Sequence, residues 1–150
     1  MLFYFIVFLI ITVDQLLKYL VHYYIHLGQS IQIINNILKL TYVRNTGAAF
    51  SLFVGYSSGL AAISLMVVIA IIYFHYKKPN DRLLQLGLAS LLGGSLGNLV
   101  DRLTRGFVVD YIDFGFWPVF NFADIMINVG VAILAYSILI GGRNHASDNC

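Results

Sequence analysis

The sequence predicts an all-α membrane protein: four transmembrane helices with a small extramembrane β element on the outer face. Of the 150 residues, 59% are apolar and only 11% are charged, whereas an average soluble domain has about 25% charged residues. Four apolar segments, at about 2–26, 57–76, 83–104 and 121–141, each reach the roughly 20 residues that a helix needs to cross a bilayer. We therefore expect a single integral membrane domain over 1–150.

The charge and the cysteine content exclude several classes of function. The formal net charge of +2 is too small to indicate a nucleic-acid partner. The single cysteine, Cys150, rules out an internal disulfide. Because it is the last residue, Cys150 also does not fit the prenylation motif, in which the cysteine is fourth from the end.

Two opposite charges interrupt the first apolar segment. Asp14 and Lys18 are four residues apart, so in a helix they share one face and can form an ion pair. This pair has two interpretations. It is either a neutralised pair that lets a membrane helix carry two charges, or the part of the helix that faces a functional site.

Polar residues interrupt the segment 28–56 too often for it to cross a membrane. The sequence LKLTYV, residues 38–43, is typical of a short strand, and we expect a small strand-rich element on the bilayer surface. Arg44 and Asn45 follow it and offer hydrogen-bond donors. Next come three small residues, beside which another backbone can approach closely: Gly47, Ala48 and Ala49.

Small residues recur on one face of the third apolar segment. They are spaced by three or four positions: Gly87, Ser90, Gly94 and Gly97. Small residues let membrane helices pack closely, so we expect a neighbouring helix against this face. The helical pattern continues into Asn98, Asp101 and Arg102, which places a polar cluster at the end of the segment.

The stretch from Asn98 to Asp124 concentrates the acidic residues. Four of the seven carboxylates lie there, in a chain without Glu: Asp101, Asp110, Asp113 and Asp124. An ionisable group close to hydrocarbon is costly and usually functional. Asp110 lies in a segment that reads as extended, and Asn121 resembles an N-cap with Asp124 three residues later. We expect Asp110 and Asp124 to meet at the membrane surface as an acid–base pair.

The number of spans determines which polar segments meet. Four spans place both termini on the same side as the basic connection 75–82, and short basic loops favour the cytoplasm. The polar segments 28–56 and 101–123 then share the outer face. That arrangement brings one set of polar residues to the same interface: Asn45, Asn98, Asp101, Arg102, Asp110 and Asp124.

Two carboxylates held close together cannot easily both ionise, so they tend to share a proton. Such a pair can activate water as a general base and polarise a carbonyl as a general acid. This chemistry hydrolyses a peptide bond without a covalent intermediate. The helix N-terminus favours the ionised form of Asp124, whereas a low dielectric opposes it, so the residue that starts protonated stays open.

Metal binding is a competing use of the acidic cluster. Carboxylate oxygens could hold Mg²⁺ or Ca²⁺, but Arg102 and Arg105 among them argue against a cation site. Zinc is less favoured, because the histidines lie elsewhere and the single cysteine is terminal. We therefore expect neither a metal nor another cofactor.

Two further functions are weighed against the acid–base pair. Residues 93–97 match G-x-S-x-G, so Ser95 could be an intramembrane nucleophile with His22 or His26 as its base. That motif needs a sharp turn between a strand and a helix, and here it lies in a helical segment. A small transporter or channel subunit that uses Asp14 and Lys18 as a relay is the second alternative. The second and third segments lack the mid-depth polar residues that it needs.

Four blocks of the sequence resemble the lipoprotein signal peptidase (signal peptidase II) family of bacterial membrane aspartyl proteases. They occur in order as DQxxK at 14–18, RNTGAAFS at 44–51, GNLVDRL with GFVVDYID at 97–113, and FNFAD at 120–124. Together they extend over nearly the whole chain. The pattern departs from the family at Ile125, where a small or hydroxylated residue is more usual, and Asn128 adds a polar residue one turn later.

The resemblance implies a catalytic dyad of Asp110 and Asp124. It implies that Asn45, Asn98, Arg102 and Asn121 line the site, and that Asp14 and Lys18 support it. It also implies a prolipoprotein substrate that is cut just before a diacylglyceryl-modified cysteine, with Gly47 and its small neighbours forming a groove for the peptide. The implied location is the bacterial cytoplasmic membrane, with the site toward the outer face, and we expect a monomer surrounded by membrane lipid.

Overall fold

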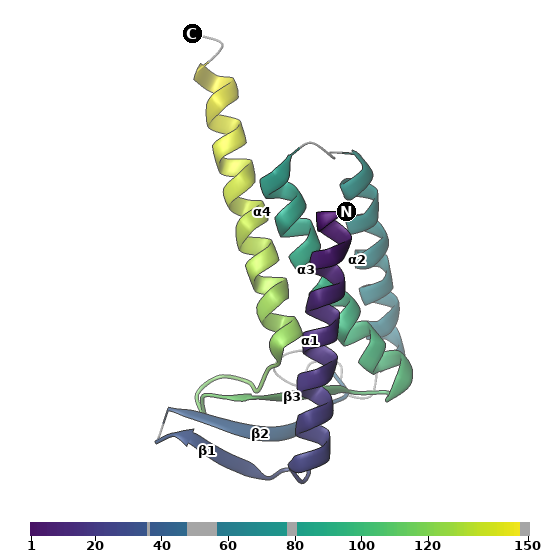
Figure 1. Cartoon of the computed structure of the whole chain (residues 1–150), viewed down its shortest axis with the longest axis vertical. Coiled ribbons are helices and arrows are strands. Elements are labelled where there is room, and N and C mark those ends of the chain that lie inside the picture. The colour runs from purple at the N-terminus through teal and green to yellow at the C-terminus, as the bar shows by residue number, and fades with distance from the viewer. Residues whose placement is uncertain (36, 48–56, 78–80, 148–150) are drawn as a thin grey trace.

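The computed structural model describes residues 1–35, 37–47, 57–77 and 81–147 (Figure 1). The elements follow in the order α1 (Leu2–Tyr24), β1 (Ser30–Ile34), β2 (Leu38–Asn45), α2 (Ser57–Lys77), α3 (Arg82–Thr104), β3 (Val108–Asp113) and α4 (Phe122–Ser147). Four long helices and a small sheet confirm the predicted fold class. Several predicted features lie outside the described residues, namely Ala48 and Ala49, residues 78–80 of the basic connection, and Cys150.

All four helices are long and apolar enough to cross a membrane. The central helix is α3, which contacts α1, α2 and α4. In its membrane-spanning window 61% of the residues are buried, compared with 28% for α1 and 11% for α2. Helix α4 continues to Ser147, beyond its predicted end near 141, because two glycines at 141–142 weaken a helix by only about 1 kcal/mol each.

The small residues of α3 allow the close packing that their spacing predicts. A Cβ atom on Gly94 would collide with the carbonyl oxygen of Ala123 and lie 3.0 Å from the backbone nitrogen of Ile127. A Cβ on Gly97 would lie 2.5 Å from Oδ2 of Asp14. The first contact brings α4 against α3, and the second brings α1 against it. Both contacts therefore position the helix ends that carry polar residues.

Gly94→Val is expected to lower the free energy of unfolding by about 1–3 kcal/mol, the usual range for overpacking a close contact. The neighbouring atoms at Gly94 include backbone atoms of α4, which cannot rotate away. Thermal unfolding in detergent micelles measures the effect. Ala62→Val, on an exposed position of α2, adds methyl groups at the surface and should leave the unfolding temperature unchanged. Equal effects of both changes would contradict the packing argument.

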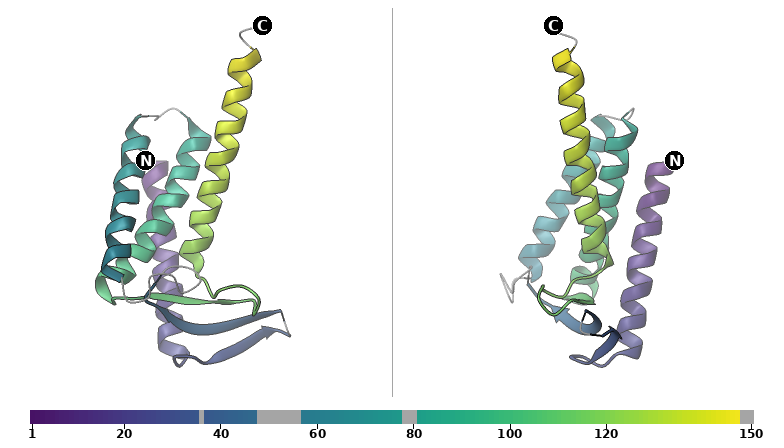
Figure 2. Two further views of the ribbon diagram at one scale, coloured as in Figure 1. Left: turned by 180° about the vertical axis from the view of Figure 1, so that it is seen from behind. Right: turned by 90° about the vertical axis from the view of Figure 1, so that its left-hand side faces the viewer.

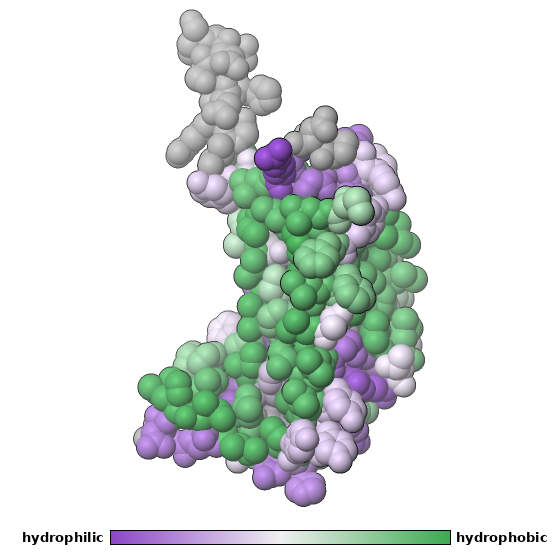
Figure 3. Space-filling model, in the orientation of Figure 1, coloured by the Kyte–Doolittle hydropathy of each residue, from purple (hydrophilic) through white to green (hydrophobic). Residues whose placement is uncertain are grey.

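The three strands form an antiparallel sheet in the order β1-β2-β3. It lies at the end of the helix bundle that is opposite both termini and extends sideways beyond the helices (Figures 1 and 2). In Figure 3 the side of the sheet that faces the apolar belt is itself hydrophobic, and its far side is hydrophilic. This distribution suits a sheet that lies flat against a bilayer. The location of the sheet on the outer face of the membrane stays a prediction.

One face of the sheet packs on the end of α1. Val109 and Tyr111 of β3 join a buried cluster with Tyr42 of β2 and with Val21 and Ile25 from the α1 end. Successive side chains of a strand point to opposite faces. The side chain of Asp110, between Val109 and Tyr111, therefore points to the other face of the sheet, toward the end of the helix bundle.

Candidate active site

Asp110 and Asp124 line one pocket of about 970 Å³ at the junction of the sheet and the bundle. Asp110 is the third residue of β3, and Asp124 lies in the first turn of α4. The pocket wall also contains four of the polar or small residues that the sequence assigned to the site: Asn45, Gly47, Asn98 and Arg102. The fold therefore brings together residues from β2, α3, β3 and α4.

Asn121 caps α4 and determines where Asp124 lies. The Asp124 backbone N–H donates to Oδ1 of Asn121 at 3.0 Å, and the Asn121 backbone N–H donates to Oδ2 of Asp124 at 3.2 Å. This reciprocal pair is the capping box that the sequence predicted, with Asp in place of Glu. It holds the Asp124 carboxylate back toward the start of the helix, where the pocket lies.

Three asparagine side chains donate to the two carboxylates. Asn45 Nδ2 donates to Oδ2 of Asp110 at 2.9 Å, and Asn121 Nδ2 donates to its Oδ1 at 2.6 Å. Asn98 Nδ2 donates to Oδ1 of Asp124 at 2.8 Å. Asn121 therefore contacts both carboxylates, one through its side chain and the other through its backbone.

The surroundings of Asp110 favour its neutral form. Its side chain is buried, with only 2% of the residue exposed, and burial raises its pKa from the usual range to about 7, with the nearby charge of Asp124 acting in the same direction. The hydrogen bonds from Asn45 and Asn121 lower this pKa in part. Near neutral pH, Asp110 can therefore hold a proton and release it, as a general acid must.

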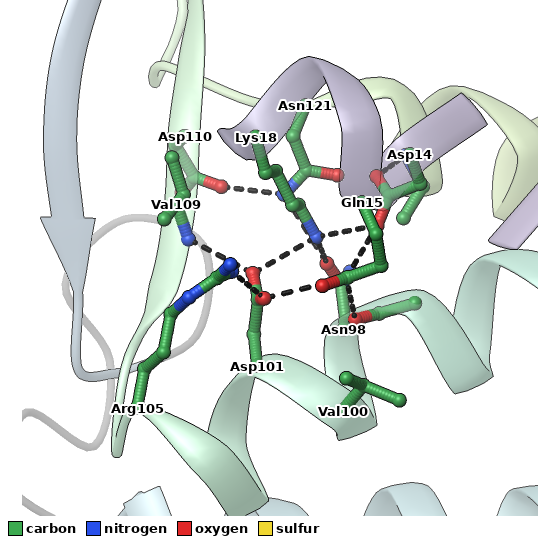
Figure 4. A network of polar contacts seen from close by, with 12 residues as sticks. Asp14, Gln15, Lys18, Asn98, Val100, Asp101, Arg105, Val109, Asp110 and Asn121 are labelled. Carbon is green, nitrogen blue, oxygen red and sulfur yellow. Dashed lines mark hydrogen bonds and ion pairs between the residues drawn. The ribbon is translucent and has the colours of Figure 1, made fainter. Parts of the chain in front are cut away.

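A buried ionic cluster, drawn in Figure 4, adjoins the pocket through Asn98, which lines the pocket and also contacts the cluster. Lys18 is fully buried, and its Nζ lies 2.8 Å from Oδ2 of Asp14 and 3.1 Å from Oδ2 of Asp101. The same Nζ donates to Oδ1 of Asn98 at 2.9 Å. Arg105 forms an ion pair with the other oxygen of Asp101. Of the two interpretations of the Asp14–Lys18 pair, the structure therefore supports the helix face that points toward the site.

The cluster also joins the elements through hydrogen bonds. Asp14 Oδ1 accepts from the backbone N–H of Ala123 at 3.0 Å, and Asp101 Oδ2 accepts from that of Val109 at 3.2 Å. Gln15 Nε2 donates to the Gly97 carbonyl oxygen at 3.0 Å and also reaches both carboxylates. Sequence reasoning assigned no role to Gln15, although a polar residue beside Asp14 in an apolar segment was a usable signal.

Asp101 and Arg102 are neighbours in the sequence, but only one of them lines the pocket. Asp101 does not line the pocket; it is fully buried in the ionic cluster. Arg102 does line the pocket. It is half-buried there, and its positive charge interacts electrostatically with Asp124 and Asp110. Within the described ranges no residue forms a salt bridge with Arg102, so its guanidinium donors remain available to a bound molecule.

The pocket also includes the two positions at which the sequence departs from the expected pattern. Ile125 and Asn128 both contribute to its wall. Asn128 Nδ2 donates to the backbone carbonyl oxygen of Asp124 at 2.9 Å, one helical turn away. Among the described residues, the hydrogen bonds to the two carboxylates come from Asn45, Asn98 and Asn121, so the departures alter the wall of the pocket and leave those bonds in place.

The alternative sites find less support. Ser95 is buried within α3 and is not part of the pocket wall. His22 forms a hydrogen bond of 2.7 Å between its Nδ1 and the hydroxyl of Tyr42. Among the described residues, no group of three or more His, Cys, Asp or Glu side chains is arranged to hold a metal ion.

Comparisons with known proteins agree with this geometry. The family model described as signal peptidase (SPase) II matches residues 6–140. The chain is 43% identical over 143 residues to a lipoprotein signal peptidase of Shouchella clausii, covering 94% of this chain and 95% of that protein. It is 42% identical over 133 residues to one of Moorella thermoacetica, covering 88% and 89%.

A solved bacterial membrane enzyme has the same fold. Its structure superposes with a TM-score of 0.89 at 31% sequence identity, covering 95% of this chain and 90% of the other. A second such structure gives a TM-score of 0.83 at 32% identity, covering 91% and 92%. The resemblance carried by the four sequence blocks is thereby confirmed, and the transporter alternative is excluded. This multi-pass membrane protein belongs to the signal peptidase II family of aspartic peptidases.

Proposed function

We propose that Asp110 and Asp124 are the catalytic pair with which this peptidase removes signal peptides from prolipoproteins. The observation that carries the proposal is that both carboxylates line one pocket, while the fully buried Asn121, which is not part of the pocket wall, hydrogen-bonds both of them. The pKa of about 7 at Asp110, caused by burial and then by the charge of Asp124, adds support. Peptide hydrolysis by two carboxylates without a covalent intermediate requires one protonated member and one ionised member.

The proposed reaction uses the two residues in opposite roles. Protonated Asp110 donates its proton to the oxygen of the scissile carbonyl, while ionised Asp124 takes a proton from the attacking water. A tetrahedral diol forms, and its collapse breaks the C–N bond. During collapse Asp124 returns its proton to the departing amine and Asp110 regains one from the diol hydroxyl, so both residues end as they began.

The substrate is proposed to bind in the same pocket as an extended peptide. Asn45 and Gly47 at the end of β2 line the pocket with the carboxylates, and Arg102 of the same pocket wall offers donors to peptide carbonyls. The remaining wall is largely apolar and includes Pro118, Val119 and Ile127, which suits a diacylglyceryl chain. We therefore propose cleavage just before the lipid-modified cysteine of the precursor.

The orientation and the surroundings of the protein belong to the same proposal. The N-terminus, the end of α2, the start of α3 and the described end of α4 lie away from the sheet, so a cytoplasmic location of the basic segment 75–82 places the pocket at the outer leaflet of the bacterial cytoplasmic membrane. We propose a monomer that acts as one peptidase domain, with membrane lipid around its exposed apolar helix faces and no metal or other cofactor.

A cleavage assay with matched substrates tests the lipid requirement. A prolipoprotein that carries diacylglyceryl on its cysteine should be cleaved, and the same precursor without the lipid should be cleaved at least about 100-fold more slowly, because it loses the apolar contacts that hold it in the pocket. Gel mobility and mass spectrometry of the products measure both rates and locate the cut bond. Equal rates for the two precursors would contradict the proposed specificity.

A further inference from the structure

The three asparagines around the catalytic pair share one feature: the amide oxygen of each accepts from a group that can only donate. Gly47 N–H donates to Oδ1 of Asn45 at 2.9 Å, and Asp124 N–H donates to Oδ1 of Asn121. A carboxamide has its acceptor and its donors on opposite branches. Fixing the oxygen of each asparagine therefore directs its NH₂ group toward the carboxylates.

Asn98 is the one asparagine of the three whose oxygen is held by a charged side chain. Its Oδ1 accepts from Lys18 Nζ at 2.9 Å, and more weakly from Asn121 Nδ2 at 3.2 Å. Its Nδ2 donates to Oδ1 of Asp124 at 2.8 Å. The reverse orientation would put an N–H group against an ammonium and an oxygen against a carboxylate, so it would replace two attractive contacts by two repulsive ones.

The buried ammonium of Lys18 is fully paired. An ammonium has three donors, and the three contacts with Asp14, Asp101 and Asn98 use all of them (Figure 4). The two carboxylates come from α1 and α3. The close approach at Gly97, where a Cβ would lie 2.5 Å from Oδ2 of Asp14, keeps those helices together. The position of Nζ is therefore determined by the packing of two helices.

We propose that Lys18 is a positioning residue that sets the orientation of the Asn98 amide and thereby keeps an N–H donor on Asp124. The proposal rests on the proposed catalytic role of Asp124. The donor stabilises the ionised carboxylate that activates water and keeps its oxygen fixed for the reaction. Lys18 does not line the pocket, and it reaches a residue that does line it through its hydrogen bond to Asn98.

A double-mutant cycle tests this route. Lys18→Met removes all three donors, and it should lower kcat roughly 10- to 100-fold, the range for one hydrogen bond to a charged group, with little change in KM. In an Asn98→Ala background the same change should cause almost no further loss of kcat, because the amide that links Lys18 to Asp124 is already absent. Additive losses would overturn the proposal, since they would mean that Lys18 acts by its own charge or through general stability.

Two matched variants separate positioning from electrostatics. Arg105→Met removes a partly exposed positive charge from the same carboxylate, Asp101, but touches no asparagine of the pocket. Because Lys18 still contacts both Asp101 and Asn98, we expect kcat to stay within about twofold. Lys18→Gln keeps an amide donor, so it should recover part of the kcat that Lys18→Met loses. An equal loss of kcat in Arg105→Met and Lys18→Met would contradict the inference.

Asn98→Asp keeps the test decisive if Lys18→Met does not fold. The new carboxylate still accepts from Lys18, but it presents an acceptor to Asp124 in place of the donor. We expect a loss of kcat at least as large as that of Lys18→Met, and an unchanged kcat would refute the inference. Failure of the proposed catalytic pair is distinguishable, because Asp124→Asn would then retain activity in the same assay, whatever the outcome of the cycle.

Discussion

Asp110→Asn and Asp124→Asn are each expected to lower kcat/KM for prolipoprotein cleavage by about 10²- to 10⁴-fold, the range of general acid–base catalysis. Asparagine has nearly the same shape as aspartate but cannot exchange a proton, so the pocket should remain while the chemistry is lost. Single-turnover cleavage of a lipidated precursor in detergent micelles measures the effect. The double variant should be hardly worse than either single one, because the two residues act as a unit.

Asp113→Asn is the matched control for these two changes. Asp113 lies on the same strand as Asp110 but outside the pocket wall. It accepts hydrogen bonds of 2.7 Å from the Thr41 hydroxyl and from the backbone N–H of Gly115, and the bond from Thr41 is the main cause that lowers its pKa. Asp113→Asn should keep kcat/KM within about threefold. Substantial activity in the double variant of Asp110 and Asp124 would refute the catalytic pair.

Asn121→Asp is expected to cause the second large effect, a loss of roughly 100-fold or more in kcat/KM at pH 7. Aspartate is as good an N-cap as asparagine, so it can keep the hydrogen bond from the Asp124 backbone N–H. It removes the donor that contacts Asp110 at 2.6 Å and places a third carboxylate beside the pair. Asn121→Ser, which also caps a helix but adds no charge, should lose less activity.

The pH dependence distinguishes this effect from a loss of fold. In the parent enzyme kcat/KM should fall as the pH rises through about 7, because Asp110 must be protonated and its pKa is about 7. The added negative charge of Asn121→Asp raises the pKa of Asp110 further, so the same alkaline limb should move to higher pH. An alkaline limb that does not move, with thermal unfolding unchanged, would contradict the assigned role of Asp110.

The local patterns of the sequence predicted much of the fold and part of the site. Apolar length indicated four helices, the spacing of Asp14 and Lys18 indicated an ion pair, and Asn121 with Asp124 indicated a capped helix. Each of these features connects residues three or four positions apart or depends on one continuous segment. Such features depend on the helical repeat alone, and the structure contains all of them.

The contacts that complete the site join residues far apart in the chain. The register that pairs Asn45 with Val108 places the Asn45 amide on Asp110. The packing of α1 on α3 brings Lys18 to Asn98 and turns Asp101 away from the pocket. A membrane helix is apolar both toward lipid and toward its neighbours, so its hydrophobic pattern does not show which face turns inward. Composition and helical repeat thus determined the helices of this protein and the cap of α4, whereas tertiary packing alone decided which polar groups meet at the two carboxylates.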